Sequence, residues 1–289
     1  MTTAIAVHGG AGVMRRDKPG AQHRAVLEQA LQAGFAILRS GGASLDAVTA
    51  AVVVLEDSPL FNAGRGACFN ADGEIEMDAS VMEGKQLRAG AVAAVRHIRN
   101  PILAARMVME KTRHVLLAGE GAERLAKQHE LVLERPEYFH TERQILARRQ
   151  NRKNYHGTVG AVALDADGNL AAATSTGGYT GKLPGRIGDS PLIGSGNYAD
   201  NRACAVSGTG LGEAFIRAAV AYDMTARMRY RGDSLAAAAR AALANVKKLG
   251  GDGGLIAVDR RGNVVTPFNS EGMHRGSIDR RGKLTLAIF

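Results

Sequence analysis

The sequence has no tryptophan, and aromatic residues make up only 4% of its 289 residues. Base-stacking arrays are therefore missing, and a nucleic-acid partner is not expected. The only two cysteines are Cys68 and Cys204, which excludes a disulfide framework and a cysteine-rich metal cluster. No apolar run approaches the length of a transmembrane helix, so no membrane partner is expected either.

The first seven residues lack a basic segment, and their apolar run is short. They are typical of a first strand rather than a signal peptide, so we expect a cytoplasmic protein. Basic residues outnumber acidic ones, giving a formal charge of +9. With no nucleic-acid motif present, this excess indicates a solvated basic surface.

Hydrophobic residues make up 45% of the chain, enough for a sizeable core. Apolar periodicity predicts helices over 22–40, 45–55 (capped by Ser44), 101–109, 121–129, 212–228 and 234–248. Strands are predicted over 4–7, 89–95, 158–164, 170–175, 203–206, 254–258 and 263–267, with a hairpin over 68–77 and a final pair near 273–288.

The predicted strands cluster near the middle and both ends, with helix pairs between them. They do not alternate regularly with helices as in a doubly wound fold, so we expect an α+β sheet sandwich covered by helices. Residues 134–156 are charged, poor in apolar periodicity and interrupted by Pro136. This segment is the predicted linker.

The most informative stretch is Gly157-Thr158, which opens an apolar run typical of a buried strand. Gly157 leaves its carbonyl open to attack, and cleavage of this bond would give Thr158 both a hydroxyl and a free α-amine. An α-amine has a pKa of roughly 7.7–8.0, so it can act as base for the hydroxyl of its own residue. The pair therefore suggests an autoproteolytic hydrolase.

Arg186 and Asp189 lie three residues apart in a glycine-rich loop. Arg186 could hold an α-carboxylate through two parallel hydrogen bonds, and Asp189 could hold an α-ammonium. Taken alone, such a pair is more commonly a weak ion pair in a surface loop.

Further along, the glycine-rich stretch 207–213 leads into a helical pattern. Such turns present backbone N–H groups that stabilise an oxyanion. The alternative is an ordinary helix start, capped by Thr209 and with Glu213 in its first turn.

Other catalytic motifs are absent. The stretch 8–12, His-Gly-Gly-Ala-Gly, lacks the ending of a P-loop and the spacing of a dinucleotide fingerprint. The chain has no Gly-x-Ser-x-Gly elbow, which disfavours an α/β-hydrolase. Its eight histidines are scattered without a zinc motif, so a catalytic zinc site is rejected.

Several blocks in fixed order resemble the plant-type (class 2) L-asparaginases, also called isoaspartyl peptidases, which are N-terminal-nucleophile hydrolases. The resemblance covers nearly the whole chain, and this many ordered blocks form a highly specific signal. The blocks are 8–12, 57–66, 77–82, 100–106, 158–163, 176–178, 182–191, 209–210 and 250–259.

The resemblance implies a single domain over 1–289 with the four-layer αββα sandwich of N-terminal-nucleophile hydrolases. It implies autocleavage into an α chain, 1–157, and a β chain, 158–289, with 134–156 as the linker. The two chains would stay together and form a homodimer of cleaved αβ units. No organic cofactor is expected.

The same resemblance assigns roles to residues. Thr158 is the nucleophile, Thr176 orients it, and Asn62 lies near the amine and the reacting carbonyl. Thr209 and Gly210 hold the oxyanion, while Arg186 and Asp189 bind the substrate. A structural sodium ion would be held by the backbone carbonyls of Leu55, Glu56, Ser58, Phe61, Ala63 and Arg65.

The expected activity is hydrolysis of β-aspartyl (isoaspartyl) dipeptides and L-asparagine, both small molecules. Alternatives are a glycosylasparaginase-like amidase, a threonine-dependent endopeptidase and a non-processing homologue that binds amino acids. The segment before Gly157 is short and arginine-rich for this family, and Gly181, Asn197 and Leu211 also depart from its pattern. These departures bear on processing rate and substrate preference.

Overall fold

The structure is a computed structural model that describes residues 2–12, 20–150 and 157–289. Its strands form an eight-stranded sheet, in the order β12-β11-β1-β5-β6-β2-β3-β4, and a four-stranded sheet, in the order β10-β9-β8-β7. The strands are β1 (Ala4–Gly12), β2 (Met77–Glu83), β3 (Ala89–Val95), β4 (Leu116–Ala118), β5 (Val159–Leu164), β6 (Leu170–Thr176), β7 (Asn197–Ala199), β8 (Cys204–Gly210), β9 (Gly253–Asp259), β10 (Val264–Val265), β11 (Gly272–Ile278) and β12 (Leu284–Ala287).

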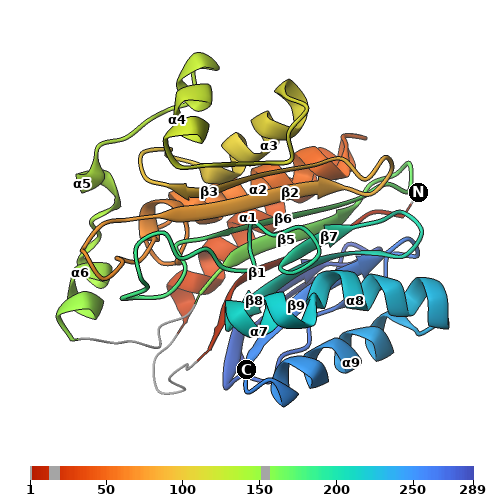
Figure 1. The fold of residues 1–289 in the computed structure, drawn as a ribbon. Coiled ribbons are helices and arrows are strands. Elements are labelled where there is room, and N and C mark those ends of the chain that lie inside the picture. The colour runs from red at the N-terminus through yellow and green to blue at the C-terminus, as the bar shows by residue number, and fades with distance from the viewer. Residues whose placement is uncertain (1, 13–19, 151–156) are drawn as a thin grey trace.

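The helices lie outside the two sheets (Figure 1). The helices α1 to α4 pack on the large sheet, and α8 and α9 pack on the small one. The helices are α1 (Ala21–Arg39), α2 (Ser44–Asp57), α3 (Pro101–Lys111), α4 (Gly119–Gln128), α5 (Pro136–Phe139), α6 (Glu142–Arg149), α7 (Gly212–Ala218), α8 (Val220–Ala226) and α9 (Leu235–Lys248).

The central strands are buried on both faces because each face meets a different layer. In β1, Ile5 and Val7 belong to the core beneath the helices, whereas Ala4 and Ala6 belong to the core between the two sheets. This follows from the two-residue period of a strand. Small residues on the inner face allow the sheets to approach closely.

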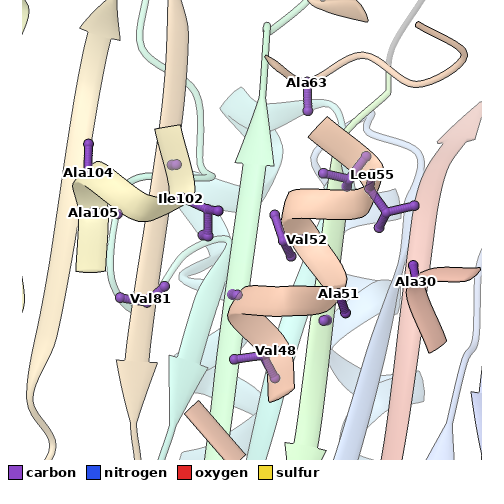
Figure 2. Close-up of a cluster of buried hydrophobic side chains, with 14 of the residues drawn as sticks. Ala30, Val48, Ala51, Val52, Leu55, Ala63, Val81, Ile102, Ala104 and Ala105 are labelled. Atoms are coloured by element: carbon purple, nitrogen blue, oxygen red, sulfur yellow. The ribbon is translucent and has the colours of Figure 1, made fainter. Parts of the chain in front are cut away.

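The outer core of the large sheet is built mainly by α2 and α3. Figure 2 shows Val48 and Val52 of α2 and Ile102 of α3 lying over its strands. All three side chains are fully buried. The helix α2 therefore lies directly over β5 and β6, the two strands that follow Gly157.

Most predicted elements are confirmed within a few residues. The predicted helix over 212–228 is instead divided into α7 and α8 at Ala219, whose backbone is left-handed with φ 44°. Ser44 does not cap α2; its N–H instead donates to the side chain of Asp165 at 3.0 Å. The strands β2, β4 and β7 were not predicted from the sequence.

The predicted linker, 134–156, contains the short helices α5 and α6, and its residues 151–156 lie outside the described part of the chain. Phe139, Gln144 and Ala147 are buried, so the segment docks on the body of the protein. Because most of this segment is charged and polar, its sequence did not indicate that these three residues would be buried. In the described ranges, no helix is long and apolar enough to cross a membrane.

The close approach of the two sheets predicts a sensitive position at Gly160. A methyl group there would lie 2.0 Å from Ser207 Oγ and 2.5 Å from His8 Nε2. We expect Gly160→Ala to destabilise the fold by about 1–3 kcal/mol, because a filled core must shift to accept it. The measurement is the change in unfolding free energy from urea titration.

The matched control is Gly121→Ala in α4, where an added methyl group would meet nothing within 4 Å. This variant should be neutral or stabilised by up to about 1 kcal/mol through helix propensity. Equal stability of the two variants would show that the sheets do not constrain position 160.

Candidate active site

Two threonines meet at one end of the central hairpin. Antiparallel pairing of β5 with β6 places Val159 opposite Ser175, so the flanking residues Thr158 and Thr176 lie side by side. The hydroxyl of Thr158 donates to the hydroxyl oxygen of Thr176 at 3.1 Å. Both residues are buried, so this contact is shielded from solvent.

The carbonyl oxygen of Gly157 accepts two side-chain hydrogen bonds. Asn62 Nδ2 donates to it at 2.9 Å and Thr176 Oγ1 at 3.0 Å. Thr176 in turn accepts the N–H of Gly178 at 3.0 Å, which orients its hydroxyl toward Gly157. Two donors on one carbonyl are the arrangement that stabilises negative charge developing on its oxygen.

The orientation of the Asn62 amide is set by its other partners. Its Oδ1 accepts the N–H of Cys68 at 2.9 Å, so the Nδ2 hydrogens point toward Gly157 and toward Gly178, whose carbonyl lies at 2.6 Å. Asn62 itself is buried in the turn that follows α2. The structure therefore brings Asn62, Gly157, Thr158 and Thr176 together.

Thr209 and Gly210 lie at the end of β8 in the facing sheet. The Thr209 hydroxyl accepts the N–H of Ala11 at 3.2 Å, which leaves its own hydrogen available for donation. Thr209 does not cap the following helix: the N-cap of α7 is Leu211, with no side-chain cap bond. Strand β1 links this pair to the threonines, since His8 contacts Thr158 and Ala11 contacts Thr209.

The side chains of Arg186 and Asp189 both lie beside Gly212. A methyl group on Gly212 would lie 2.7 Å from Arg186 Nη2 and 2.9 Å from Asp189 Oδ1. Arg186 forms two hydrogen bonds with Glu213, Nε to Oε1 and Nη2 to Oε2, each of 3.0 Å. Its guanidinium also lies 4.6 Å from the centre of the Tyr179 ring. Contrary to the surface alternative, only 13% of the Arg186 side chain is exposed.

Asp189 is buried, and its Oδ2 has no hydrogen-bond partner. Desolvation by burial raises the pKa of this carboxyl to about 7, although the neighbouring Arg186 works in the opposite direction. A buried carboxylate oxygen without a partner is costly. A ligand bearing an ammonium group would satisfy it.

The loop after α2 was expected to hold sodium through backbone carbonyls. A methyl group on Gly64, whose φ is +50°, would lie 2.5 Å from the carbonyl oxygen of Glu56, so glycine lets the loop close around its own oxygens. The carbonyls of Leu55 and Ala63 each accept one backbone N–H, and each retains a second lone pair. Backbone carbonyl oxygens of this kind are suitable ligands for a hard cation. No described residues form a cluster of three or more His, Cys, Asp or Glu side chains suited to a metal.

Two residues at the site were missed from the sequence. His8 is fully buried, and its ring contacts the backbone carbonyl of Thr158 at 2.9 Å. Glu213 was considered only as a helix-start residue, whereas it is the partner of Arg186. The available signal for His8 was its place before Gly9-Gly10 at the end of a predicted strand. Nothing in the sequence pointed to Glu213 beyond its charge.

The arrangement can support nucleophilic attack on a carbonyl. It combines a buried hydroxyl, a neighbouring hydroxyl that accepts from it, and a carbonyl oxygen already held by two donors. A basic side chain and a buried carboxyl lie together where they could bind a zwitterion.

Comparison with known proteins agrees with this geometry. The model of the family described as Asparaginase matches residues 1–288. The chain is 52% identical over 292 residues to an isoaspartyl peptidase of Escherichia coli, covering 94% of this chain and 91% of that protein. It is 51% identical over 292 residues to the isoaspartyl peptidase of Salmonella typhimurium, with 94% and 93% covered. It is 44% identical over 300 residues to an isoaspartyl peptidase/L-asparaginase of Mus musculus, with 100% and 91% covered. The chain therefore belongs to the asparaginase family that its sequence motifs indicated.

Proposed function

We propose that this chain is a threonine amidohydrolase that cuts itself between Gly157 and Thr158 and then hydrolyses β-aspartyl dipeptides and L-asparagine. The observation that carries the proposal is the Gly157 carbonyl, held by Asn62 and Thr176 beside the Thr158 hydroxyl. The relatives named isoaspartyl peptidase and isoaspartyl peptidase/L-asparaginase support the substrate class.

In the first step, Thr158 Oγ attacks the carbonyl carbon of Gly157. The oxygen of that carbonyl takes up negative charge, which the two donors stabilise. The C–N bond breaks, the proton of the hydroxyl passes to the departing nitrogen, and an ester joins Gly157 to Thr158. Water then hydrolyses the ester, leaving a Gly157 carboxylate and a free α-amine on Thr158.

In the second step, that α-amine accepts the proton of its own hydroxyl as Thr158 attacks the substrate amide. Thr209 Oγ1 and the Gly210 N–H would hold the new oxyanion, and the leaving amine takes up the proton. An aspartyl ester remains on Thr158, and water releases aspartate from it. The Thr209 hydroxyl suits this role because Ala11 occupies one of its lone pairs and not its hydrogen.

The aspartyl part of the substrate would be bound by Arg186 and Asp189. Its α-carboxylate pairs with the guanidinium, and its α-ammonium satisfies Asp189 Oδ2, which lacks a partner. Tyr179, whose ring lies beside the Arg186 guanidinium, belongs to the stretch 178–182 around which a glycosylasparaginase would need room for a sugar. The paired donors on Gly157 disfavour the non-processing alternative.

Other properties of the family are proposed with this function. The two facing sheets and their outer helices support the four-layer αββα sandwich of N-terminal-nucleophile hydrolases. We propose a sodium ion in the carbonyl loop and a homodimer of cleaved αβ units. A sodium ion would stiffen the turn that carries Asn62, without taking part in any bond change. The expected cytoplasmic location stays a prediction from the sequence.

The first prediction concerns self-cleavage. Purified wild-type protein should separate into two fragments, 1–157 and 158–289, and Thr158→Ala should remain intact because it lacks the attacking oxygen. Intact mass spectrometry after timed incubation measures both. The control Thr49→Ala removes another buried threonine hydroxyl, bonded to Leu45 within α2, and should still be cleaved. Wild-type protein that stays at full length would contradict autocleavage.

The second prediction concerns pH. Asp189 has a raised pKa of about 7, so it becomes neutral as the pH falls through that value and loses its attraction for an ammonium. We expect KM for L-asparagine to rise below this pH, by up to about tenfold per pH unit. The α-amine of Thr158 ionises in a similar pH range. Its protonation in the substrate complex lowers kcat, whereas protonation of Asp189 raises KM.

Separate kcat and KM profiles therefore distinguish the two groups. Asp189→Asn should show a high KM that no longer depends on this ionisation. The control Asp167→Asn changes an exposed turn residue and should keep the wild-type profile. A wild-type KM that stays constant from about pH 5 to about pH 8 would refute the role of Asp189.

The third prediction concerns the leaving group. The site has specific groups for the aspartyl part, whereas the leaving amine has few predicted contacts. We expect turnover of β-Asp-Leu, slower turnover of L-asparagine and little turnover of N-acetylglucosaminyl-asparagine. Side-by-side kcat/KM values decide between the alternatives. Preference for the glycosylated substrate would favour the glycosylasparaginase-like amidase.

A further inference from the structure

His8 connects the threonine pair to the facing sheet. Its side chain is fully buried at the point where β1 passes between β5 and β11. Nδ1 lies 2.9 Å from the backbone carbonyl oxygen of Thr158, and Nε2 lies 2.9 Å from the hydroxyl of Ser207 in β8. One ring therefore spans the space between the two sheets.

The partners of the ring determine which nitrogen carries the hydrogen. A carbonyl oxygen can only accept, so Nδ1 must be the donor to Thr158. Nε2 then accepts from the Ser207 hydroxyl, and Ser207 accepts from Thr174 at 2.7 Å. Thr174 in turn accepts from Asn197 Nδ2 at 3.2 Å. Every donor in this chain meets an acceptor, with a neutral imidazole at its end.

The surroundings keep that imidazole neutral. Burial lowers the pKa of His8 to about 3, because desolvation outweighs the hydrogen bond to Thr158. The absence of a side chain at Gly160 leaves room for the His8 ring, because a methyl group there would meet both Ser207 Oγ and His8 Nε2. Both the burial of His8 and the glycine at position 160 are therefore compatible with this chain of hydrogen bonds.

We propose that His8 is a positioning residue that holds the backbone of Thr158 in place through its Nδ1–H after the bond to Gly157 has been cut. The inference rests on the proposed role of Thr158 as nucleophile. Before cleavage, Gly157 restrains Thr158 covalently. Afterwards Thr158 is a chain end, one residue before the β5 pairing that begins at Val159. A fixed donor on its carbonyl then restrains the direction of its hydroxyl and amine.

The alternative is that His8 is an ordinary buried histidine that contributes only stability. Two amide substitutions separate these roles. The amide nitrogen of asparagine is as many bonds from Cα as Nδ1, so His8→Asn retains a donor toward Thr158. The amide of glutamine extends as far as Nε2, so His8→Gln reaches Ser207 but loses the donor to Thr158.

The experiment compares wild type, His8→Asn and His8→Gln in their cleaved forms with β-Asp-Leu as substrate. We expect His8→Gln to lose kcat by about tenfold or more with KM almost unchanged, and His8→Asn to stay within about threefold of wild type. Thr225→Val is the control, since it removes a buried hydroxyl bonded within its own helix and should leave both constants unchanged. Equal losses in both His8 variants, or a loss confined to KM, would overturn the inference.

A second measurement applies even if the variants fold poorly. Nitrogen-15 NMR of histidine-labelled wild-type protein should show His8 with a proton on Nδ1 and none on Nε2, at neutral pH. A ring with its proton on Nε2 and none on Nδ1 would overturn the inference, because that tautomer could not donate to Thr158. Failure of the proposed function is seen separately, as wild-type protein that neither cleaves itself nor turns over substrate.

Discussion

Antiparallel pairing of β5 with β6 determines where the reacting groups lie. The pairing sets Val159 opposite Ser175 and so brings Thr158 and Thr176 within hydrogen-bond distance. A one-residue slip would turn these side chains to the opposite face of the sheet. The slip is opposed by burial on both faces, with α2 covering one face and β8 and β9 the other. The same register holds the Gly157 carbonyl against Thr176 and Asn62.

The second constraint is the burial of ionisable side chains whose hydrogen-bonding groups are not all satisfied. One carboxyl oxygen of the buried Asp189 has no hydrogen-bond partner. Two hydrogen bonds join the guanidinium of Arg186 to the carboxylate of Glu213. Such a site is poorly satisfied when empty, which favours a ligand that brings both charges. Glu213 fixes the plane of the guanidinium before the ligand arrives, so less side-chain freedom is lost on binding.

Local sequence predicted the parts of this site that depend on short-range structure. The turn at 165–169 joins β5 to β6, so the meeting of Thr158 and Thr176 followed from one hairpin. Asn62 could be placed only through the family resemblance, since it contacts a carbonyl 95 residues away. The pair His8–Ser207 depends on how the two sheets pack, and Arg186 and Glu213 lie 27 residues apart in the sequence, so neither pair leaves a local pattern. Likewise, an alanine-containing helical run gave no sign of the left-handed residue at Ala219.

The central claim is that Thr158 forms a covalent ester with the aspartyl part of the substrate. The most direct test is acid quenching of the cleaved enzyme during turnover of L-asparagine, followed by peptide mapping by mass spectrometry. The account predicts an added aspartyl group on the peptide that begins with Thr158, sensitive to hydroxylamine as an ester should be. An aspartyl group attached to any other residue would contradict it.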